Sequence, residues 1–506
     1  MNLRCALLVA AVLLPCLVTI RPALAGGTLR YGMQDDPDAL DPAQSGSYSG
    51  RVVFAALCDK LIDTNSEMQF VPQLATAWKW SADGRSLTLN LRQGVHFQDG
   101  TLFDATAVKV NLERYLKASY SLRKVELGPL TAITVIDPDT VRLTLSQPYA
   151  PLLAVLADRS GMMLSPKALA AAGKKIALHP VCAGPFSFAD RVAEDHITLE
   201  RFPGYWNAGA IHIDRITYKM IPNAAVRLEN LEAGALDIME QVPAADIPSM
   251  LAHKNLQLIS SPALAYATIS FNVAHGPNAA SPLGHDRRVR QALAMAIDRA
   301  TLNKVVFGGE FIPNNQTEVP HSTYWDSAFP VAAPDLQAAR KLLAAAGDPT
   351  VSFTLLTDNT PTDAEVGQVL QSMARPAGFH ISLRPMDANA EVASARSGNY
   401  QAALVFWSGR ADPDFNLSIW LACNGFLNWG HYCSKPFDTL LEQARSSTDM
   451  AARQALYRQV VAAYLRDVPH LFLYNLRWLW GATGRLQGFT PVPDGLFRPQ
   501  GVTLGN

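Results

Sequence analysis

The sequence predicts a large α/β protein with at least two domains. Its 506 residues are more than a single hydrophobic core usually spans. From about residue 270 to 475, segments with helical spacing alternate with short apolar runs, which is typical of an α/β domain with a layered sheet. From about 60 to 180, short strands follow one another around tight turns, so this part is expected to be a meander with few helices.

The chain before the meander starts with a predicted strand at 29–33 and an acidic loop. The loop carries four aspartates, Asp35, Asp36, Asp38 and Asp41. They could be ligand contacts or a calcium loop. Clusters of Asp and Pro more often build turns and helix caps, and we favour that interpretation. A helix is expected at 51–61, where apolar residues recur with helical spacing.

Two hairpins are predicted in the meander. An Asp-Gly pair between alternating apolar residues predicts the first at 78–91, and an Asp-Pro pair predicts the second at 134–145. Between them, Asp104 is expected to cap the N-terminus of a helix with an apolar face. After the meander, strands are predicted at 197–201, 216–221 and 236–240, and a helix at 225–233.

The α/β part from 270 to 475 is predicted element by element from its apolar periodicity. Strands are expected at 266–273, 351–355, 379–383, 402–407 and 471–474. Helices are expected at 288–303, 335–346, 436–445 and 451–466. Thr362 and Glu365 form a predicted capping box in front of a further helix that carries 366–373.

The stretch from 400 to 433 is the strongest candidate for a ligand site. Its apolar strand ends at Trp407, and a loop of opposite charges follows at Arg410, Asp412 and Asp414. In α/β proteins, ligands bind at the carboxyl edge of the sheet, where such a loop lies. Trp407 adds a flat apolar surface beside these charges. We therefore expect this stretch to form one wall of a ligand cleft.

Residues 1–25 have the pattern of a secretory signal peptide. Arg4 gives the positive start, 6–18 is an apolar stretch too short to span a bilayer comfortably, and 23–25 form an A-x-A cleavage site. An uncleaved membrane anchor is the alternative. We expect the mature protein to begin near Gly26 and to be soluble outside the cytoplasm.

Composition and charge describe an ordinary globular protein. Hydrophobic residues make up 49% of the chain, and the formal net charge is −1. No basic cluster stands out along the sequence, so nothing favours nucleic acid as a partner.

Four cysteines remain after the signal peptide, Cys58, Cys182, Cys423 and Cys433. An even number of cysteines in an oxidising compartment suggests disulfides. Cys423 and Cys433 would close a short loop, and Cys58–Cys182 is the pairing that is left over. A metal site is the alternative. Because no Cys-x-x-Cys and no His-x₃-His spacing occurs, we expect neither a metal nor a cofactor.

Several short motifs occur along the chain in one order. They are Asp36-Pro37, Leu40-Asp41-Pro42, Cys58-Asp59-Lys60-Leu61, Pro72-Gln73-Leu74-Ala75, Leu91-Arg92-Gln93-Gly94-Val95-His96-Phe97, Gly184-Pro185-Phe186, Val289-Arg290-Gln291-Ala292-Leu293 and Asp412-Pro413-Asp414. With them, the chain resembles the extracellular solute-binding proteins of ABC importers for peptides, nickel chelates, opines and related solutes. This is solute-binding protein family 5, and the resemblance covers essentially the whole mature chain.

The resemblance implies a two-lobed α/β fold of the periplasmic-binding-protein type II-like kind, with an additional α+β subdomain inserted in the first lobe. The implied parts are a first lobe at 26–268 with the subdomain at about 60–180, a second lobe at 269–477, and a return to the first lobe at 478–506. Two chain crossings, near 269–272 and 475–480, would form a hinge that lets the lobes close on a solute.

The resemblance also implies a binding protein and no enzyme. It would capture a small solute, a peptide or a peptide-like compound with a carboxylate, and deliver it as a monomer to ABC permease subunits in the inner membrane. Import of a metal chelate or an opine is the alternative. A secreted hydrolase and a secreted chaperone are further alternatives, although neither a G-x-S-x-G nor an H-E-x-x-H motif occurs.

One position departs from the family. In peptide-binding members, an acid three residues after the conserved tryptophan holds the amino group of the ligand, and that position is Arg410 here. Arginine grips a carboxylate through two parallel hydrogen bonds, so the solute is expected to carry one. Two alternatives are that Asp412, two residues further on, takes the place of the missing acid, and that Arg410 forms an internal ion pair with Asp412 or Asp414. The predicted ligand-binding residues are Trp407, Arg410, Asp412, Asn428, Met33 and Gln34.

Overall fold

The computed structural model describes residues 26–505. The predicted signal peptide, 1–25, lies outside these residues. Within 26–505, no helix combines the length and the hydropathy needed to cross a bilayer.

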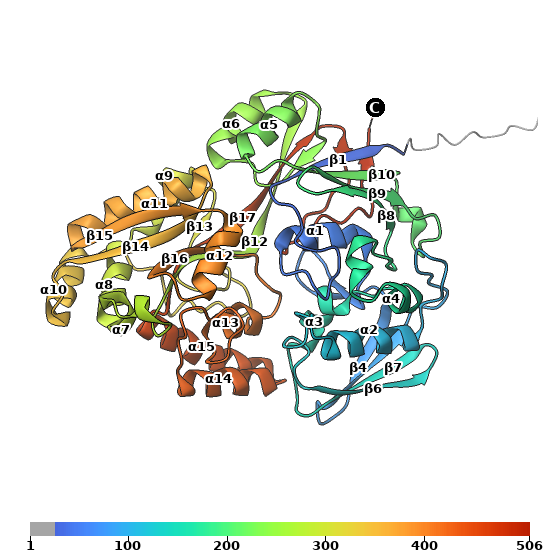
Figure 1. The fold of residues 1–506 in the computed structure, drawn as a ribbon, viewed down its shortest axis with the longest axis horizontal. Coiled ribbons are helices and arrows are strands. Elements are labelled where there is room, and N and C mark those ends of the chain that lie inside the picture. Colours follow the sequence, from blue (N-terminus) through green and yellow to red (C-terminus); the bar gives the residue numbers. More distant parts are fainter. Residues whose placement is uncertain (1–25, 506) are drawn as a thin grey trace, which may run out of the picture.

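The molecule consists of two halves that are connected by two long neighbouring strands, β12 (Leu256–Phe271) and β17 (His470–Thr483) (Figure 1). These strands pair antiparallel from Leu256↔Thr483 to Ser270↔His470. Each half therefore contributes strands to one continuous sheet, in the order β15-β14-β16-β12-β17-β11-β1-β10-β9-β8. The ladder is irregular between Pro262 and Tyr266, where three residues lie opposite Leu476 alone.

The first half is built on the start of the chain. Its share of the sheet consists of β1 (Thr28–Met33), β8 (Phe186–Val192), β9 (His196–Arg201), β10 (Arg215–Met220) and β11 (Ile238–Met239). β1 runs parallel to β10 and β11, with Met33 opposite Met220 and Gly32 opposite Met239. The carboxyl ends of these three strands therefore lie at one edge of the sheet, and Gln34 and Glu240 directly follow there.

The second half has a parallel core of three strands, β14 (Val351–Asp358), β15 (Phe379–Met386) and β16 (Ala402–Trp407). The chain enters β14 after α10 (Leu336–Ala346), at the outer end of the molecule, and leaves β15 into α12 (Ala388–Arg396), which lies near its middle (Figure 1). The carboxyl ends of β14 and β15 therefore point toward the first half.

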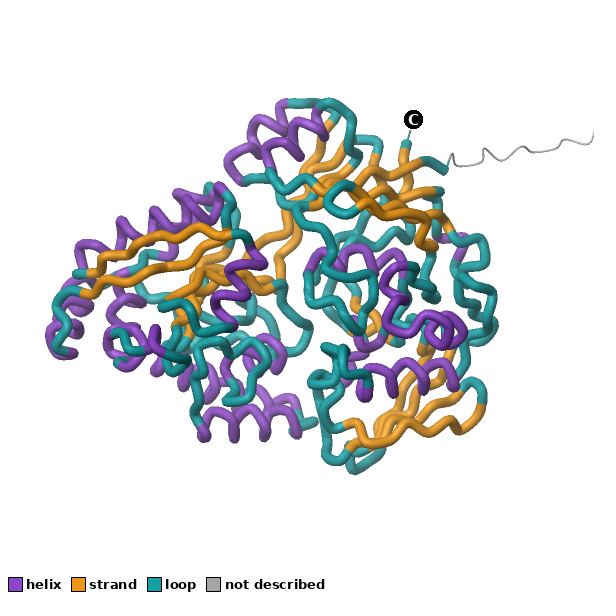
Figure 2. The backbone as a smooth tube through the Cα atoms, viewed as in Figure 1, coloured by secondary structure: helices purple, strands orange, loops and turns teal. Residues whose placement is uncertain are grey.

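The predicted meander is confirmed as a subdomain of the first half. It has a four-stranded antiparallel sheet in the order β4-β5-β7-β6, covered by one helix (Figure 2). Its elements are β4 (Ala75–Trp80), β5 (Ser86–Leu91), α2 (Ala105–Lys117), β6 (Leu130–Asp137) and β7 (Thr140–Leu145). Both predicted hairpins are present, and Asp104 caps α2 by accepting a hydrogen bond from the Ala107 amide.

The remaining elements surround these sheets. In the first half they are α1 (Tyr48–Leu57), β2 (Ile62–Thr64), β3 (Phe70–Pro72), α3 (Leu152–Leu156), α4 (Pro166–Ala172), α5 (Ala224–Glu232), α6 (Ile247–Ala252), β18 (Leu486–Gln487) and β19 (Thr503–Leu504). In the second half they are α7 (Pro282–His285), α8 (Arg287–Ala296), α9 (Arg299–Phe307), β13 (Ile312–Pro313), α11 (Pro361–Ala374), α13 (Asp414–Leu421), α14 (Lys435–Ser446) and α15 (Met450–Asp467).

Three predictions of local structure differ from the fold. The helix expected at 288–303 is two helices, because Asp298 leaves the helical conformation and caps α9. The expected capping box is wrong, since Thr360 caps α11 and the helix starts at Pro361. The loop expected after Trp407 contains α13, a helix whose residues are almost all buried and therefore show no apolar stripe.

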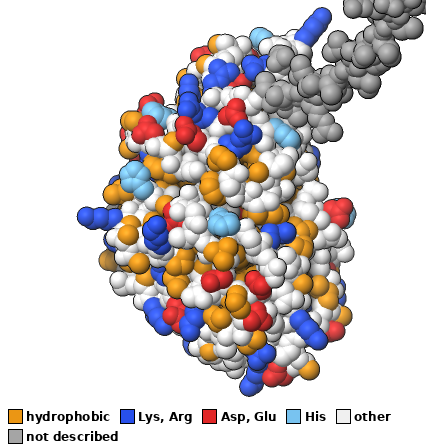
Figure 3. Space-filling model, turned by 90° about the vertical axis from the view of Figure 1, so that its right-hand side faces the viewer, with side chains coloured by type: hydrophobic (Ala, Val, Ile, Leu, Met, Phe, Trp, Pro, Cys, Tyr) orange, Lys and Arg blue, Asp and Glu red, His pale blue; other side chains and the backbone are white. Residues whose placement is uncertain are grey.

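Each half has its own hydrophobic core, and Phe415 of α13 in the second half also packs into the cluster of the subdomain. The core of the first half surrounds Tyr31, Trp478 and Trp480, and a second cluster fills the subdomain. The second half has one core on each face of its sheet. On the outer face of the first half, acidic and basic side chains are interspersed (Figure 3), as the near-zero net charge suggests.

Both predicted disulfides are present. Cys58 at the end of α1 is bonded to Cys182, and Cys423 is bonded to Cys433 after α13. Each bond lies within one half of the molecule.

The two disulfides are expected to stabilise unequally. In the chain-entropy account, closing 10 residues contributes about 3 kcal/mol and closing 124 residues contributes about 5 kcal/mol. The C423S/C433S variant should therefore lose less free energy of unfolding than the C58S/C182S variant. Urea unfolding followed by tryptophan fluorescence measures both losses, and the reverse order would contradict the expectation.

Candidate functional site

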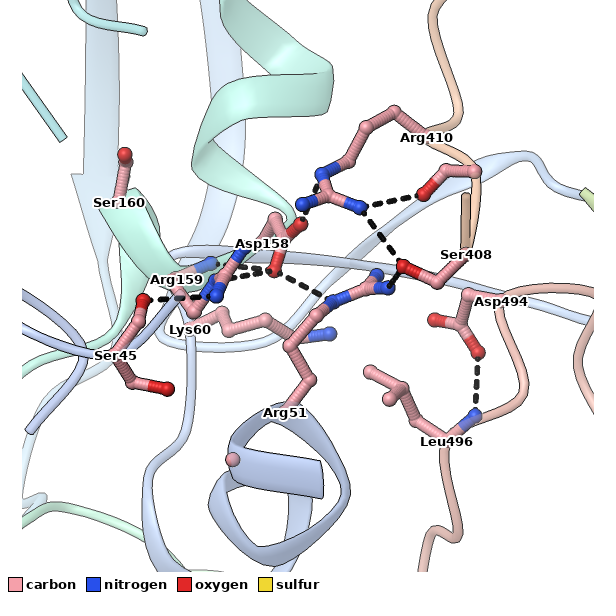
Figure 4. A network of polar contacts seen from close by, with 12 residues as sticks. Ser45, Arg51, Lys60, Asp158, Arg159, Ser160, Ser408, Arg410, Asp494 and Leu496 are labelled. Atoms are coloured by element: carbon pink, nitrogen blue, oxygen red, sulfur yellow. Dashed lines mark hydrogen bonds and ion pairs between the residues drawn. The ribbon is translucent and has the colours of Figure 1, made fainter. Parts of the chain in front are cut away.

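The two halves meet at a group of charged side chains that we call the arginine cluster: Arg51, Asp158, Arg159, Ser408 and Arg410 (Figure 4). Arg51 comes from α1, and Asp158 and Arg159 follow α3, all in the first half. Ser408 and Arg410 lie just after β16 in the second half. Arg410 Nε lies 3.0 Å from Asp158 Oδ2, and Arg51 Nη1 donates to Ser408 Oγ at 3.3 Å.

Asp158 is the central acceptor of the arginine cluster. Its Oδ1 accepts from Arg51 Nε at 3.2 Å and from the Arg159 amide at 2.7 Å. Burial alone would raise the pKa of Asp158, but Arg51, Arg410 and Arg159 together hold it well below its ordinary value. Burial also lowers the pKa of Arg410 to about 10, and nearby Arg51 adds to this effect.

Positive charge is in excess around this contact. Arg123 also points here, donating to the Ser45 carbonyl and pairing with Glu126. Four arginines thus face two carboxylates, Asp158 and Glu126, which leaves two positive charges uncompensated. A buried excess of this kind favours an anion as a binding partner.

Trp407 and Arg410 are brought together as the sequence predicts. Arg410 Cζ lies 4.4 Å from the centroid of the Trp407 ring, a cation–π arrangement. Asn416 Oδ1 holds both by accepting from Trp407 Nε1 at 3.1 Å and from the Arg410 amide at 2.8 Å. The turn between them needs Gly409, whose φ is +76° and whose added Cβ would lie 2.4 Å from Leu264 Cβ.

The other predicted residues of the second half have internal partners. Both oxygens of Asp412 accept from Arg453, at 2.7 and 2.8 Å, and Asp414 pairs with Arg445. These pairs, rather than Arg410, use the two carboxylates. The Asn428 side chain donates to the Ala422 carbonyl at 2.9 Å and accepts from the Tyr432 amide at 3.0 Å. It therefore shapes the loop closed by the disulfide.

Met33 and Gln34 lie at the carboxyl end of β1, apart from the arginine cluster. Met33 is fully buried in the core of the first half. The Gln34 amide donates to Glu240 Oε1 at 2.8 Å. Their position leads to a second charged group, which sequence reasoning did not assemble.

We call this second group the acidic cluster: Asp35 and Glu240 from the first half, and Asp358, Asp363 and Glu391 from the second. Asp35 and Glu240 follow β1 and β11. Asp358 ends β14, Asp363 lies in the first turn of α11, and Glu391 lies in the first turn of α12. All five therefore stand at the carboxyl edges of the parallel strands, which point toward each other across the gap.

The carboxylates of the acidic cluster disturb each other's pKa values. Burial raises the pKa of Glu391 to about 8, and Asp363 and Asp358 contribute to this rise. Burial and Asp358 raise the pKa of Asp363 to about 7. The surrounding protein raises the pKa of Asp35, and so do Asp358 and Asp387 of the opposite half, although the Asp35 side chain remains open to solvent. The two halves therefore approach closely here.

The acidic loop after β1 is mostly a turn structure, as we favoured from the sequence. Asp38 accepts from Ser45, Gly46 and Ser47, Asp41 pairs with Arg114, and Asp36 lies 2.9 Å from Arg191. Asp35 alone among these four has no hydrogen bond or ion pair within residues 26–505. Its neighbours in the sequence did not distinguish it.

Cavities in the structure do not by themselves mark a site. A cavity of about 20 Å³ lies at the arginine cluster, which is room for little more than one water. A hollow of about 390 Å³ lies beside Arg30 and Asp237, which pair with each other at 2.8 Å. A solute at the arginine cluster therefore has to separate the two halves.

Comparison with known proteins gives a consistent family. The family described as bacterial extracellular solute-binding proteins, family 5 Middle, matches residues 69–428. The glutathione-binding protein GsiB of Pectobacterium atrosepticum is 30% identical over 474 residues, covering 91% of this chain and 90% of that protein. GsiB of Salmonella paratyphi A is 30% identical over 486 residues, or 94% of each chain.

Solved structures of the same kind share the fold. The PBP AgaA in complex with agropinic acid, from A. tumefacien R10, has a TM-score of 0.84 and 26% identity, covering 95% of this chain and 99% of that one. The periplasmic binding protein DppA of Helicobacter pylori, in complex with the peptide STSA, has a TM-score of 0.84 and 25% identity, covering 95% and 98%.

The raised pKa of Glu391 predicts a pH-dependent stability. A carboxyl group with a folded-state pKa of about 8, against an ordinary value of 4.5, keeps its proton in the folded state after the unfolded chain has lost it. Between about pH 5 and 8, this group therefore lowers the free energy of unfolding as pH rises.

The variant E391Q removes the titrating group and should melt higher than the wild type at pH 8, with a smaller difference at pH 5. Thermal unfolding of both proteins without solute, between pH 5 and pH 8, measures this difference in melting temperature. Parallel melting curves at every pH would contradict the assignment.

Proposed function

Because the chain belongs to the bacterial extracellular solute-binding proteins of family 5, we propose that it captures a carboxylate-bearing solute between its two halves for an ABC importer. Proteins of this family bind solutes, and the chain is not an enzyme. The peptide-like class of solute and the residues that bind it are our proposal.

Arg410 carries the proposal. Its guanidinium lies over the Trp407 ring, with Cζ 4.4 Å from the ring centroid, and its Nη1 donates to the Gly409 carbonyl at 2.7 Å. The Nη2 atoms of Arg410 and Arg51 have no hydrogen bond within residues 26–505, so both remain free to donate to an anion. A solute carboxylate would enter when the halves open, and would take up part of the uncompensated positive charge.

The relatives support the same class of solute. The ligands for which these relatives are known are glutathione, agropinic acid and a peptide, each of which carries a carboxylate. A peptide or peptide-like solute is the first candidate, because the glutathione-binding relatives align over nine-tenths of the chain. An opine is the second candidate, because the structure of AgaA with agropinic acid shares the fold at 26% identity.

A hinge would lie where β12 and β17 pass between the halves. We propose the first half as 26–268 with 478–506, and the second as 269–477. The irregular stretch from Pro262 to Tyr266, opposite Leu476, interrupts the ladder and lies between the separate cores. The second predicted crossing, 475–480, includes Leu476. The first, 269–272, is paired regularly with β16 and follows a second shift in the β12–β17 ladder, between Ala267 and Thr268. We therefore propose that the pivot includes the irregular stretch from Pro262 to Thr268.

Export and delivery complete the proposal. Cleavage after residue 25 would release the protein into the periplasm, where the closed, loaded monomer would dock on the permease in the inner membrane. The two disulfides agree with an oxidising compartment.

Arg410 is testable as the carboxylate anchor. A panel of glutathione, agropinic acid and the peptide Ser-Thr-Ser-Ala is first screened by thermal shift on the mature protein. For the solute that binds, R410A should lower the affinity at least tenfold in calorimetry, which corresponds to about 1.4 kcal/mol. R458A, which removes a largely exposed arginine of the same half, is the matched control and should bind as the wild type does.

The variant D158N tests whether Arg410 binds the solute or only holds the two halves together. It removes the charge that holds Arg410 across the gap but leaves Arg410 free for a solute. We expect D158N to keep or improve the affinity measured by calorimetry. If D158N loses as much affinity as R410A, Arg410 acts only as a contact between the halves.

A further inference from the structure

We propose that the acidic cluster binds a positively charged nitrogen of the solute, an ammonium group, while the arginine cluster binds its carboxylate. This inference rests on the proposed function, because it places both groups in the gap between the two halves. It narrows the solute class to zwitterions with an unblocked amine.

The acidic cluster lies within reach of the arginine cluster. Asp358 ends β14, and the pairing of Leu356 with Ala403 places it level with Val405 of β16, two residues before Trp407. Since a strand rises about 3.3 Å per residue and neighbouring strands are about 4.8 Å apart, the Cα atoms of Asp358 and Arg410 are separated by at most about 20 Å. The two clusters thus lie along one edge of the sheet, within reach of a short peptide.

Two glutamates of the acidic cluster have buried side-chain oxygens without a hydrogen-bond partner in the described part of the chain. The Glu391 side chain is only 7% exposed, and it accepts no hydrogen bond within residues 26–505; its Oε1 is completely buried. Glu240 is 3% exposed, and its buried Oε2 has no partner either. Proteins rarely leave buried carboxylate oxygens unpaired, since the desolvation cost is then uncompensated. Arg227, whose Nε and Nη2 are also buried without a partner, acts on Glu240, whereas no arginine or lysine is paired with Glu391 among the described residues. A donor from outside the chain is therefore needed at Glu391 above all.

The acids that the second half contributes to the cluster have no basic side chain beside them, among the described residues, to neutralise their charge. The side chain of Arg227 in α5 is the cation that acts on Asp35 and Glu240. Its Nη1 donates to the carbonyls of Ile221 and Pro222 at 2.6 and 2.9 Å, which fixes it on the side of the first half. No arginine or lysine is paired with Asp358, Asp363 or Glu391 among the described residues, so the second half presents acids alone.

The geometry favours an ammonium group over a metal ion. Within residues 26–505, no three His, Cys, Asp or Glu side chains come close enough together to ligate a metal. The five carboxylates come from both halves and from separate element ends. A metal ion needs several ligands that converge on one point, whereas each N–H of an ammonium group binds one acceptor, so a single buried carboxyl group such as Glu391 can anchor it.

Matched pairs of solutes test the inference. Glutathione and Ser-Thr-Ser-Ala are each compared with their N-acetylated forms, which keep the carboxylates and lose the positive charge, and glutarate serves as a carboxylate without nitrogen. Calorimetry on the mature protein should give at least tenfold tighter binding for the free amine in a pair that binds. Equal affinity within the pairs, or binding of glutarate and the capped forms alone, would overturn the inference and leave the proposed function intact.

Variants make the assignment specific. E391Q should lower the affinity for the free amine at least tenfold and should leave the affinity for the capped form unchanged. R410A should weaken both forms. The matched control is E365Q, an exposed acid of α11 two residues after Asp363, which should change neither. Failure of every carboxylate in the panel to bind would reject the proposed function and this inference with it.

E391Q is expected to fold, because glutamine has the same size and replaces a buried carboxyl group that has no hydrogen-bond partner among the described residues. Its melting temperature at pH 8 verifies this in the same samples. If E391Q is folded and binds the free amine as tightly as the wild type does, the acidic cluster is not the ammonium site.

Discussion

The antiparallel pairing of β12 with β17 is the constraint on which the rest of the structure depends. These two strands carry the chain from one hydrophobic core to the other, and each core is complete on its own side. Their ladder is interrupted near Leu476 and again between Ala267 and Thr268, so the pairing is regular on either side of one short irregular stretch. Everything that faces the gap, including the arginine cluster and the acidic cluster, is held in register by this pairing.

The gap contains charge that the protein does not neutralise by itself. Near Arg410, four arginines surround two carboxylates, and near Glu391 several carboxylates approach without a cation from the second half. In an unliganded protein such charges reduce stability, because burial strengthens both repulsion and the cost of missing hydrogen bonds. A solute of complementary charge would neutralise these groups and so bind more tightly. It would also favour the closed arrangement, in which both halves contact it.

The sequence predicted what depends on neighbouring residues. The hairpins, the cap at Asp104, the Cys423–Cys433 disulfide and the meeting of Trp407 with Arg410 follow from local patterns, and Cys58–Cys182 followed as the remaining pair. The acidic cluster could not be found this way, because Asp35 and Asp358 stand over 300 positions apart and each looks like an ordinary turn residue. Buried α13 was missed for a related reason: a helix that is covered on all sides has no apolar stripe. The partner of Arg410, Asp158, gave no signal either, since their contact exists only between the halves.

The two disulfides also limit what oxidation can do to this molecule. Each joins residues inside one half, so neither disulfide links the two halves. Oxidation can therefore stabilise each half without linking the two halves covalently. How far the halves open then depends on the irregular pairing near Leu476 and on the non-covalent contacts between the halves.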